Sequence, residues 1–139
     1  ISAEVKKFNE RCAIVPTVVD LARYPSAREH KEERIFKAVW IGGRSTLGYL
    51  ESILPSLKPL TRSLPNFRLV VIADVFPENP PVPMKRILWS ETTEAENLLR
   101  SDTGLMPLPD DAWTRGKCGL KLIQYGAAGL PALFSPVGV

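Results

Sequence analysis

Short apolar segments that alternate with helix-patterned segments constrain the fold of this chain more than any other feature. Residues 35–41 form an apolar run interrupted only by Lys37, and residues 67–73 form a second run, FRLVVIA. Such runs are typical of parallel strands that are buried on both faces. Further strands are predicted at residues 84–89, 103–108 and 132–135, with a short one at 12–15. The pattern predicts an α/β fold: a Rossmann-like open parallel sheet of five or six strands with helices on both faces. Its expected core residues are Val39, Ile41, Val70, Ile72, Ile87, Leu105 and Leu133.

Helical patterns occupy the segments between the predicted strands. Leucines recur at spacings of three and four from Leu47 to Leu64, and Pro55 and Pro59 within this stretch predict a kink or a break. A second helix is expected after Ser90, which suits an N-cap and precedes an acidic first turn.

The third helix is predicted at residues 117–128. Leu120 and Ile123 follow a helical spacing and are expected to face the sheet, and Gly129 and Pro131 end the helix. At the other end of the chain, residues 1–10 predict a short amphipathic helix.

Composition excludes several classes of function. The 139 residues suit one domain, and 18 basic and 15 acidic residues are interspersed along the chain. No basic face for nucleic acid is therefore expected. Cys12 and Cys118 lack the spacing of a metal site, and no metal or cofactor is predicted. No stretch approaches the roughly 18 apolar residues of a membrane span, and reduced cysteines favour a cytoplasmic location.

Two glycine-bearing turns are candidates for anion binding. Gly42 and Gly43 follow the first strand and precede Arg44, but they match neither the dinucleotide fingerprint nor a P-loop. An NAD site and a P-loop ATPase are therefore not supported. Contact with a ligand and an ordinary strand-to-helix turn are equally open interpretations here.

The second turn lies where a loop enters the third helix. Gly116 and Gly119 flank Lys117 and Cys118, and Lys121 follows within the helix. Backbone N–H groups at a helix start, with two lysines beside them, suit a phosphate. Lysines exposed only to solvent are the alternative.

A resemblance to a known family rests on the last part of the chain. Residues 104–139 read GLMPLPDDAWTRGKCGLKLIQYGAAGLPALFSPVGV. This resembles the donor-binding half of GT-B glycosyltransferases of the group 1 or family 4 type. Their E-G-F-G segment leads into a helix that bears a second Glu. Gly116 and Gln124 replace the family's two carboxylates, but a branch with the pattern R-G-K-C-x-x-K-x-x-Q-Y-x-A-x-G-x-P matches closely. VPTVVDLARYP (15–25) resembles the family's interdomain linker, although an ordinary turn suits Asp20 equally well.

The resemblance implies a domain organisation and a ligand. Residues 1–34 correspond to an interdomain linker and domain-entry segment, and residues 35–139 to a truncated donor-binding domain. The implied substrate is a nucleoside diphosphate sugar, with an acceptor-binding domain missing ahead of the chain. The fragment alone is expected to be inactive, and no catalytic residue is assigned. The implied donor-binding residues are Gly42, Gly43, Arg44, Trp89, Lys117, Cys118, Gly119, Leu120, Lys121 and Gln124.

Alternatives to this function stay open. The missing carboxylates also suit a non-catalytic nucleotide-binding or scaffold module that retains the glycosyltransferase fold. An unrelated doubly wound domain is the third alternative. For Trp89, stacking on the nucleobase competes with a role as an aromatic core anchor.

Overall fold

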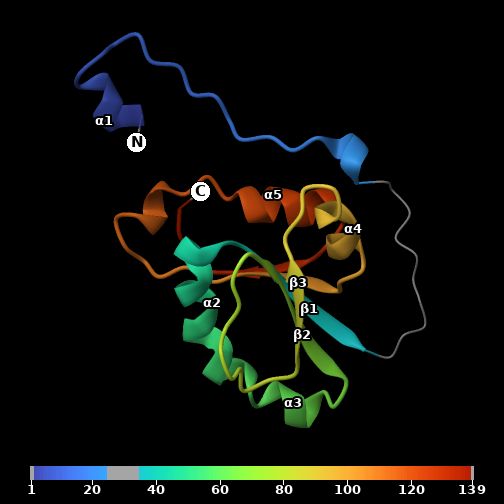
Figure 1. The fold of residues 1–139 in the computed structure, drawn as a ribbon. Helices are drawn as coiled ribbons and strands as arrows, with labels where there is room; N and C mark the ends of the chain where they lie inside the picture. Colours follow the sequence, from blue (N-terminus) through green and yellow to red (C-terminus); the bar gives the residue numbers. More distant parts are fainter. Residues whose placement is uncertain (1, 25–34, 139) are drawn as a thin grey trace.

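Five parallel strands form a single sheet at the centre of the molecule. The computed structural model describes residues 2–24 and 35–138. Residues 26–34, whose almost wholly polar and charged sequence predicts a solvated loop, lie outside the described residues. The strands run in the order β3-β2-β1-β4-β5, and every neighbouring pair is parallel (Figure 1). Their bounds are β1 Phe36–Ile41, β2 Phe67–Ala73, β3 Met84–Leu88, β4 Thr103–Met106 and β5 Ala132–Phe134. The predicted α/β fold with an open parallel sheet is confirmed, whereas residues 12–15 do not form a strand.

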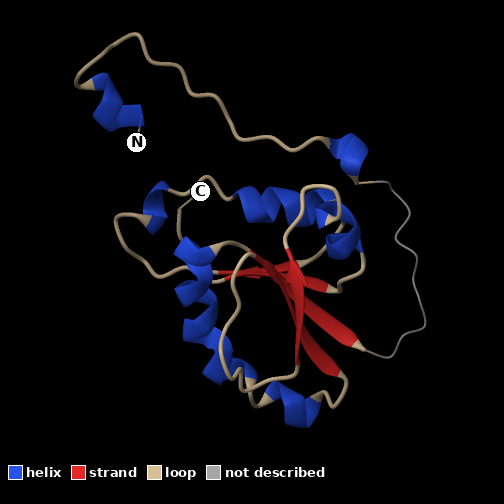
Figure 2. Ribbon diagram, in the orientation of Figure 1, coloured by secondary structure: helices blue, strands red, loops and turns tan. Residues whose placement is uncertain are grey.

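Helices cover both faces of the sheet (Figure 2). Alternate residues of a strand point to opposite faces, so Val39 packs on one side and Trp40 on the other. The Val39 side packs against α4 (Glu94–Leu99) and α5 (Leu120–Ala127), and the Trp40 side against α2 (Arg44–Leu57). Burial on both faces explains why β1 and β2 are apolar almost throughout.

The expected core is confirmed at its centre and wrong at one edge. Val39, Ile41, Val70 and Ile72 are buried in one cluster, against which Ile87 is partly buried, and Leu105 is buried in the cluster on the other face. Leu133, however, has 67% of its surface exposed. It lies on β5, an edge strand of three residues that pairs only with β4. A short apolar run predicts a strand but does not reveal whether a helix covers it.

The helix bounds differ from the sequence predictions in physically simple ways. The leucine-rich segment breaks as expected: α2 ends at Leu57 and α3 (Leu60–Ser63) begins after Pro59. Before α4, the N–H groups of Thr93 and Glu94 donate to the Ser90 carbonyl, so a turn occupies the place predicted for the first helical turn. Within the described residues, no helix combines the length and apolar character that crossing a bilayer needs.

The second half of the N-terminal segment contacts the rest of the molecule, through Thr17, Val19 and Tyr24. Helix α1 (Ser2–Lys6) is short, and Phe8 beyond it is 90% exposed. From α1, which lies away from the sheet, the chain runs to a 3-10 turn at Leu21–Arg23, where Asp20 Oδ1 accepts a hydrogen bond from the Ala22 N–H at 3.0 Å (Figure 1). Asp20 thus caps this turn, and the next residue, Tyr24, is buried in the core beside α4 and α5.

Candidate functional site

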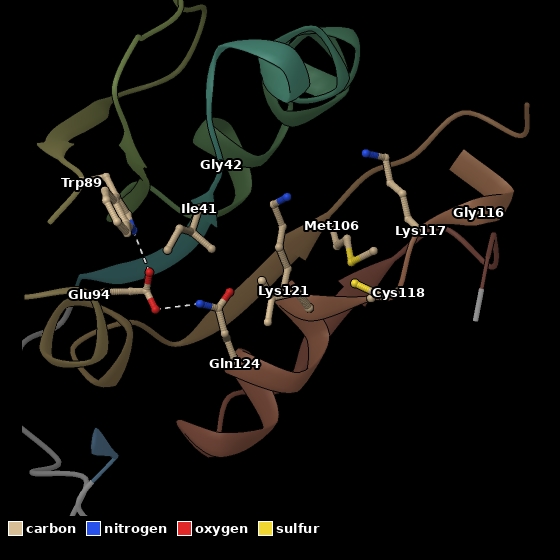
Figure 3. A pocket seen from close by; sticks show the side chains of 12 residues that line it. Ile41, Gly42, Trp89, Glu94, Met106, Gly116, Lys117, Cys118, Lys121 and Gln124 are labelled. Atoms are coloured by element: carbon tan, nitrogen blue, oxygen red, sulfur yellow. Dashed lines mark hydrogen bonds between the residues drawn. The ribbon is translucent and has the colours of Figure 1, made fainter. Parts of the chain in front are cut away.

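A crevice of about 540 Å³ opens at the carboxyl ends of β1 and β4. The strand order reverses between these two strands, so their connections leave toward opposite faces of the sheet. Such a switch point is the usual ligand site of an open parallel sheet, and the volume lies within the range of small-molecule pockets. The crevice is lined by Ile41, Gly42, Trp89, Glu94, Met106, Gly116, Lys117, Cys118, Gly119, Leu120, Lys121 and Gln124 (Figure 3).

Tyr125 of α5 occupies the gap in which β1 and β4 separate. The two strands pair only at Ala38 and Val39. Beyond that point the Tyr125 hydroxyl donates to the Leu105 carbonyl at 3.0 Å and accepts from the Ile41 N–H at 3.4 Å. These bonds replace direct pairing between the strands. A side chain at Gly104 would overlap the Tyr125 ring, since an added Cβ would lie 2.3 Å from it. Gly104 leaves room for the Tyr125 ring between the two strands. The ring keeps the strands apart, and its hydroxyl forms the hydrogen bonds that their backbone groups would otherwise lack.

The start of α5 forms one end of the crevice. Gly119 has φ +68°, a left-handed conformation that glycine adopts without strain, and the helix begins at Leu120. Lys117 precedes the helix in extended conformation. The prediction of a helix beginning at Lys117 is therefore wrong, and Lys117 does not share a helix face with Lys121. The loop nevertheless brings both lysines to the same crevice.

The buried face of α5 also differs from the prediction. Leu120 is 40% exposed and Ile123 only half-buried, whereas Gln124 and Tyr125 are buried. The reason is that the helix turns its most polar buried residue toward Glu94 of α4 and its tyrosine toward the strands. An apolar pattern of eight residues could not reveal this rotation.

Lys117 and Lys121 face aromatic rings rather than carboxylates. Lys117 Nζ lies 5.5 Å from the centroid of the Tyr49 ring and 5.8 Å from that of Trp113, and Lys121 Nζ lies 5.7 Å from that of Trp40. Within residues 2–24 and 35–138, neither lysine forms an ion pair with an acidic side chain. Burial lowers the pKa of Lys121 below its ordinary value, and the nearby charge of Lys117 lowers it further. An anion entering the crevice would relieve both effects.

A buried polar cluster forms the other end of the crevice. Glu94 and Gln124 are only 7% and 8% exposed. Glu94 accepts a hydrogen bond from the Trp89 indole N–H at 2.6 Å and another from the Gln124 amide at 2.6 Å (Figure 3). The Tyr24 hydroxyl lies beside the Glu94 carboxylate and the Gln124 amide. Burial raises the pKa of this hydroxyl, and the negative charge of Glu94 raises it further.

Glu94 is the charged crevice residue that sequence reasoning missed; Ile41 and Met106, which also line the crevice, were predicted only as strand residues. Its place among acidic residues after Ser90 favoured a helix-capping role, and nothing in the local pattern pairs it with α5. The available signal was its position just after the carboxyl end of a strand, five residues beyond Trp89. Trp89 itself is half exposed at the rim, and its indole N–H is bound to Glu94.

Gly43 and Arg44 do not line the crevice, unlike the other predicted site residues. The Asp74 carboxylate accepts a hydrogen bond from the Arg44 backbone N–H at 3.0 Å, so an acidic side chain already occupies the start of α2. The Gly43 N–H is also engaged, by Thr46 Oγ1 at 3.3 Å. A phosphate at this helix start would meet the Asp74 charge, and the ordinary structural interpretation of this turn is favoured.

Cys118 lies exposed at the rim, beside Lys117. A hydrogen bond from Thr17 lowers the pKa of its thiol, as do the Leu120 N–H and the Lys117 charge. Among the described residues, no group of three or more His, Cys, Asp or Glu side chains is arranged to hold a metal ion.

Comparison with known proteins adds no family to these observations. No protein-family model matches the sequence, and no curated protein matches it either.

Proposed function

We propose that the crevice binds a nucleoside diphosphate sugar and that the chain is the donor-binding domain of a glycosyltransferase. The observation that carries the proposal is the opposite polarity of the two crevice ends. Lysines 117 and 121 lie at the start of α5, and the Glu94–Gln124 pair lies about 6 Å further along the helix axis, a rise of four residues. A nucleoside diphosphate has the same polarity, since its diphosphate is anionic and its sugar offers hydroxyl donors.

Each part of the crevice has a role in this proposal. The diphosphate meets the positive end of the α5 dipole and the two lysine side chains. The ribose lies at Gln124, and Trp89, half exposed at the rim, stacks on the base. Stabilising a departing diphosphate is an electrostatic task, and a helix start with two lysines is suited to it. The resemblance of residues 104–139 to the GT-B donor domain supports the same assignment.

Calorimetric titration of the 139-residue chain with uridine and guanosine diphosphates tests the proposal. Loss of one charge-assisted phosphate contact in Lys117→Ala or Lys121→Ala should cost about 1.5–3 kcal/mol of binding free energy. The matched control is Lys58→Ala, which removes an exposed lysine at the far end of α2. Unchanged affinity in Lys117→Ala, Lys121→Ala and Gln124→Ala alike would contradict the assignment of the site.

A non-catalytic nucleotide-binding module is the second candidate. It is favoured by one observation: Glu94, the only carboxylate that lines the crevice in the described part of the chain, already accepts hydrogen bonds on both oxygens. Both candidates require nucleotide binding, and they differ in catalysis. Transfer of a labelled sugar by the natural protein, lost in Lys121→Ala, would support the enzyme; nucleotide binding without transfer would favour the module.

A further inference from the structure

Residues 17–24 of the N-terminal segment contact the elements that carry the crevice, although none of them lines it. At the start of α5, the Thr17 hydroxyl forms a hydrogen bond with the Cys118 thiol. Val19 packs against the core cluster to which α4 and α5 contribute, and Tyr24 is buried in that cluster. The segment therefore runs from the lysine end of the crevice to its polar end.

Tyr24 joins the two helices at the polar end of the crevice. Its hydroxyl donates to the Glu94 carboxylate and is also hydrogen-bonded to the Gln124 amide. Glu94 belongs to α4 and Gln124 to α5, and both side chains line the crevice. Because this hydroxyl bonds to both of them, the orientation of the pair depends on Tyr24 as well as on the Trp89 N–H.

Arg23 holds the loop that precedes α4. Its guanidinium donates to the Glu91 carbonyl and lies 3.5 Å from the Glu91 carboxylate. Glu91 lies between Trp89 and Glu94 in the sequence, so this contact restrains a loop that carries two crevice residues. A hollow of about 340 Å³ beside the contact is lined by Arg23, Glu91, Thr92 and Ala95. An exposed ion pair beside an unfilled hollow adds little stability, so the segment can detach locally.

We infer that residues 17–24 act as a clasp on the crevice: the docked segment holds α4 and α5 in the arrangement that binds a ligand, so docking and ligand binding favour each other. The inference goes beyond the proposed function and rests on it for the identity of the ligand. The coupling is reciprocal, since a ligand that binds the docked form more tightly must favour docking by the same factor. Arg23 and Tyr24 are positioning residues in this account, because neither lines the crevice.

The experiment measures docking by amide hydrogen exchange, followed residue by residue by NMR in the 139-residue chain. The N–H groups of residues 22–24 are hydrogen-bonded within the 3-10 turn of the clasp. A saturating concentration of uridine or guanosine diphosphate should slow their exchange about 5-fold or more, although these residues do not line the crevice. The N–H groups of Phe8 and Asn9 bond to the Val5 carbonyl outside the clasp and are the internal control. Their exchange should not change.

Tyr24→Ala tests the reciprocal effect on affinity. It removes the buried anchor of the clasp, so the segment should be largely undocked and the nucleoside diphosphate should bind about 5-fold or more weakly. Phe8→Ala, which truncates an exposed aromatic residue of the same segment outside the clasp, is the matched control and should bind as the wild type does.

Arg23→Ala covers the case in which Tyr24→Ala does not fold, because it changes only a surface contact. It should speed the exchange of the Ala22 and Tyr24 N–H groups by up to about 5-fold, and added ligand should slow that exchange again. Its control is Arg100→Ala, which removes an exposed ion pair with Glu96 of α4 and should leave the exchange of residues 22–24 unchanged.

The outcomes separate the clasp from the proposed function. Ligand binding that leaves the exchange of residues 22–24 unchanged overturns the inference while the proposed function stands. A folded Tyr24→Ala variant that binds as tightly as the wild type does the same. Equal slowing at residues 22–24 and at Phe8 and Asn9 would mean general stabilisation rather than docking, which also overturns the clasp. Absence of binding to either nucleoside diphosphate overturns the proposed function, and the clasp falls with it.

Discussion

At the scale of single residues, the charge of Lys121 should make the affinity of the crevice for an anion depend on pH. Its pKa lies below the ordinary value of 10.5 because the side chain is largely desolvated beside Lys117. A bound diphosphate favours the charged form and raises this pKa, so binding takes up a proton wherever the free lysine is partly neutral. Affinity for a nucleoside diphosphate should therefore fall as pH rises toward 10.5, beginning below that value. Calorimetry across the alkaline range measures this. Lys121→Arg, which stays charged, should flatten the profile, and an equally steep profile in that variant would refute the assignment.

Tyr125 supports the opening between β1 and β4 through a single hydroxyl. In Tyr125→Phe the Leu105 carbonyl and the Ile41 N–H lose a buried partner, which should lower the free energy of unfolding by about 1–3 kcal/mol. Urea denaturation measures the change. Tyr49→Phe, at a half-buried position on α2, is the control and should fall within about 0.5 kcal/mol of the wild type. If Tyr125→Phe is as stable as Tyr49→Phe, β1 and β4 must pair directly once the hydroxyl is lost, and the hydroxyl is then not needed to satisfy their backbone groups.

At the scale of elements, the start of α5 depends on a backbone conformation rather than on side-chain contacts. Gly119→Ala places a Cβ on a residue with φ +68° and should destabilise the fold by about 1–2 kcal/mol. Gly126→Ala in the same helix meets no atom within 4 Å and should instead stabilise by about 0.5–1 kcal/mol. Opposite shifts of the two unfolding midpoints are the expected result. Shifts of the same sign would show that helix propensity, not the left-handed turn, dominates here.

At the scale of the whole molecule, the crevice joins α4, α5 and the ends of three strands, so a ligand there should stabilise the fold as a unit. At 100 times its dissociation constant, a nucleoside diphosphate should add about 2.7 kcal/mol, which raises the thermal midpoint by about 10 °C for a chain of this size. Differential scanning fluorimetry measures the shift. The parent nucleoside, which lacks the diphosphate, should have a much smaller effect, and an equal effect would place the main binding energy away from the lysines.

The sequence by itself determined the five strands of the sheet and the class of fold, and its resemblance to a known family named most of the residues that line the crevice. An apolar run such as residues 67–73 predicts a strand that is buried on both faces of a sheet. The glycines on either side of Lys117 predict a loop that leads into a helix. Such features are local, because each depends on the periodicity or backbone freedom of a few neighbouring residues. That is why the positions of the sheet strands and of the glycine-bearing loop before α5 were predictable, whereas the helix face expected for Lys117 was wrong.

Only the tertiary structure decided which partners meet across elements. Glu94 accepts a hydrogen bond from Gln124 across 30 positions of sequence, and Asp74 occupies the start of α2, where ligand contact at Gly43 and Arg44 was one of two open interpretations. The exposure of Leu133 follows from strand order, because β5 is at the edge of the sheet. In each case the outcome depends on whether a distant segment supplies a hydrogen bond, a charge or a covering surface. No pattern within a short stretch of sequence encodes such a pairing, because its free energy exists only once the chain has folded.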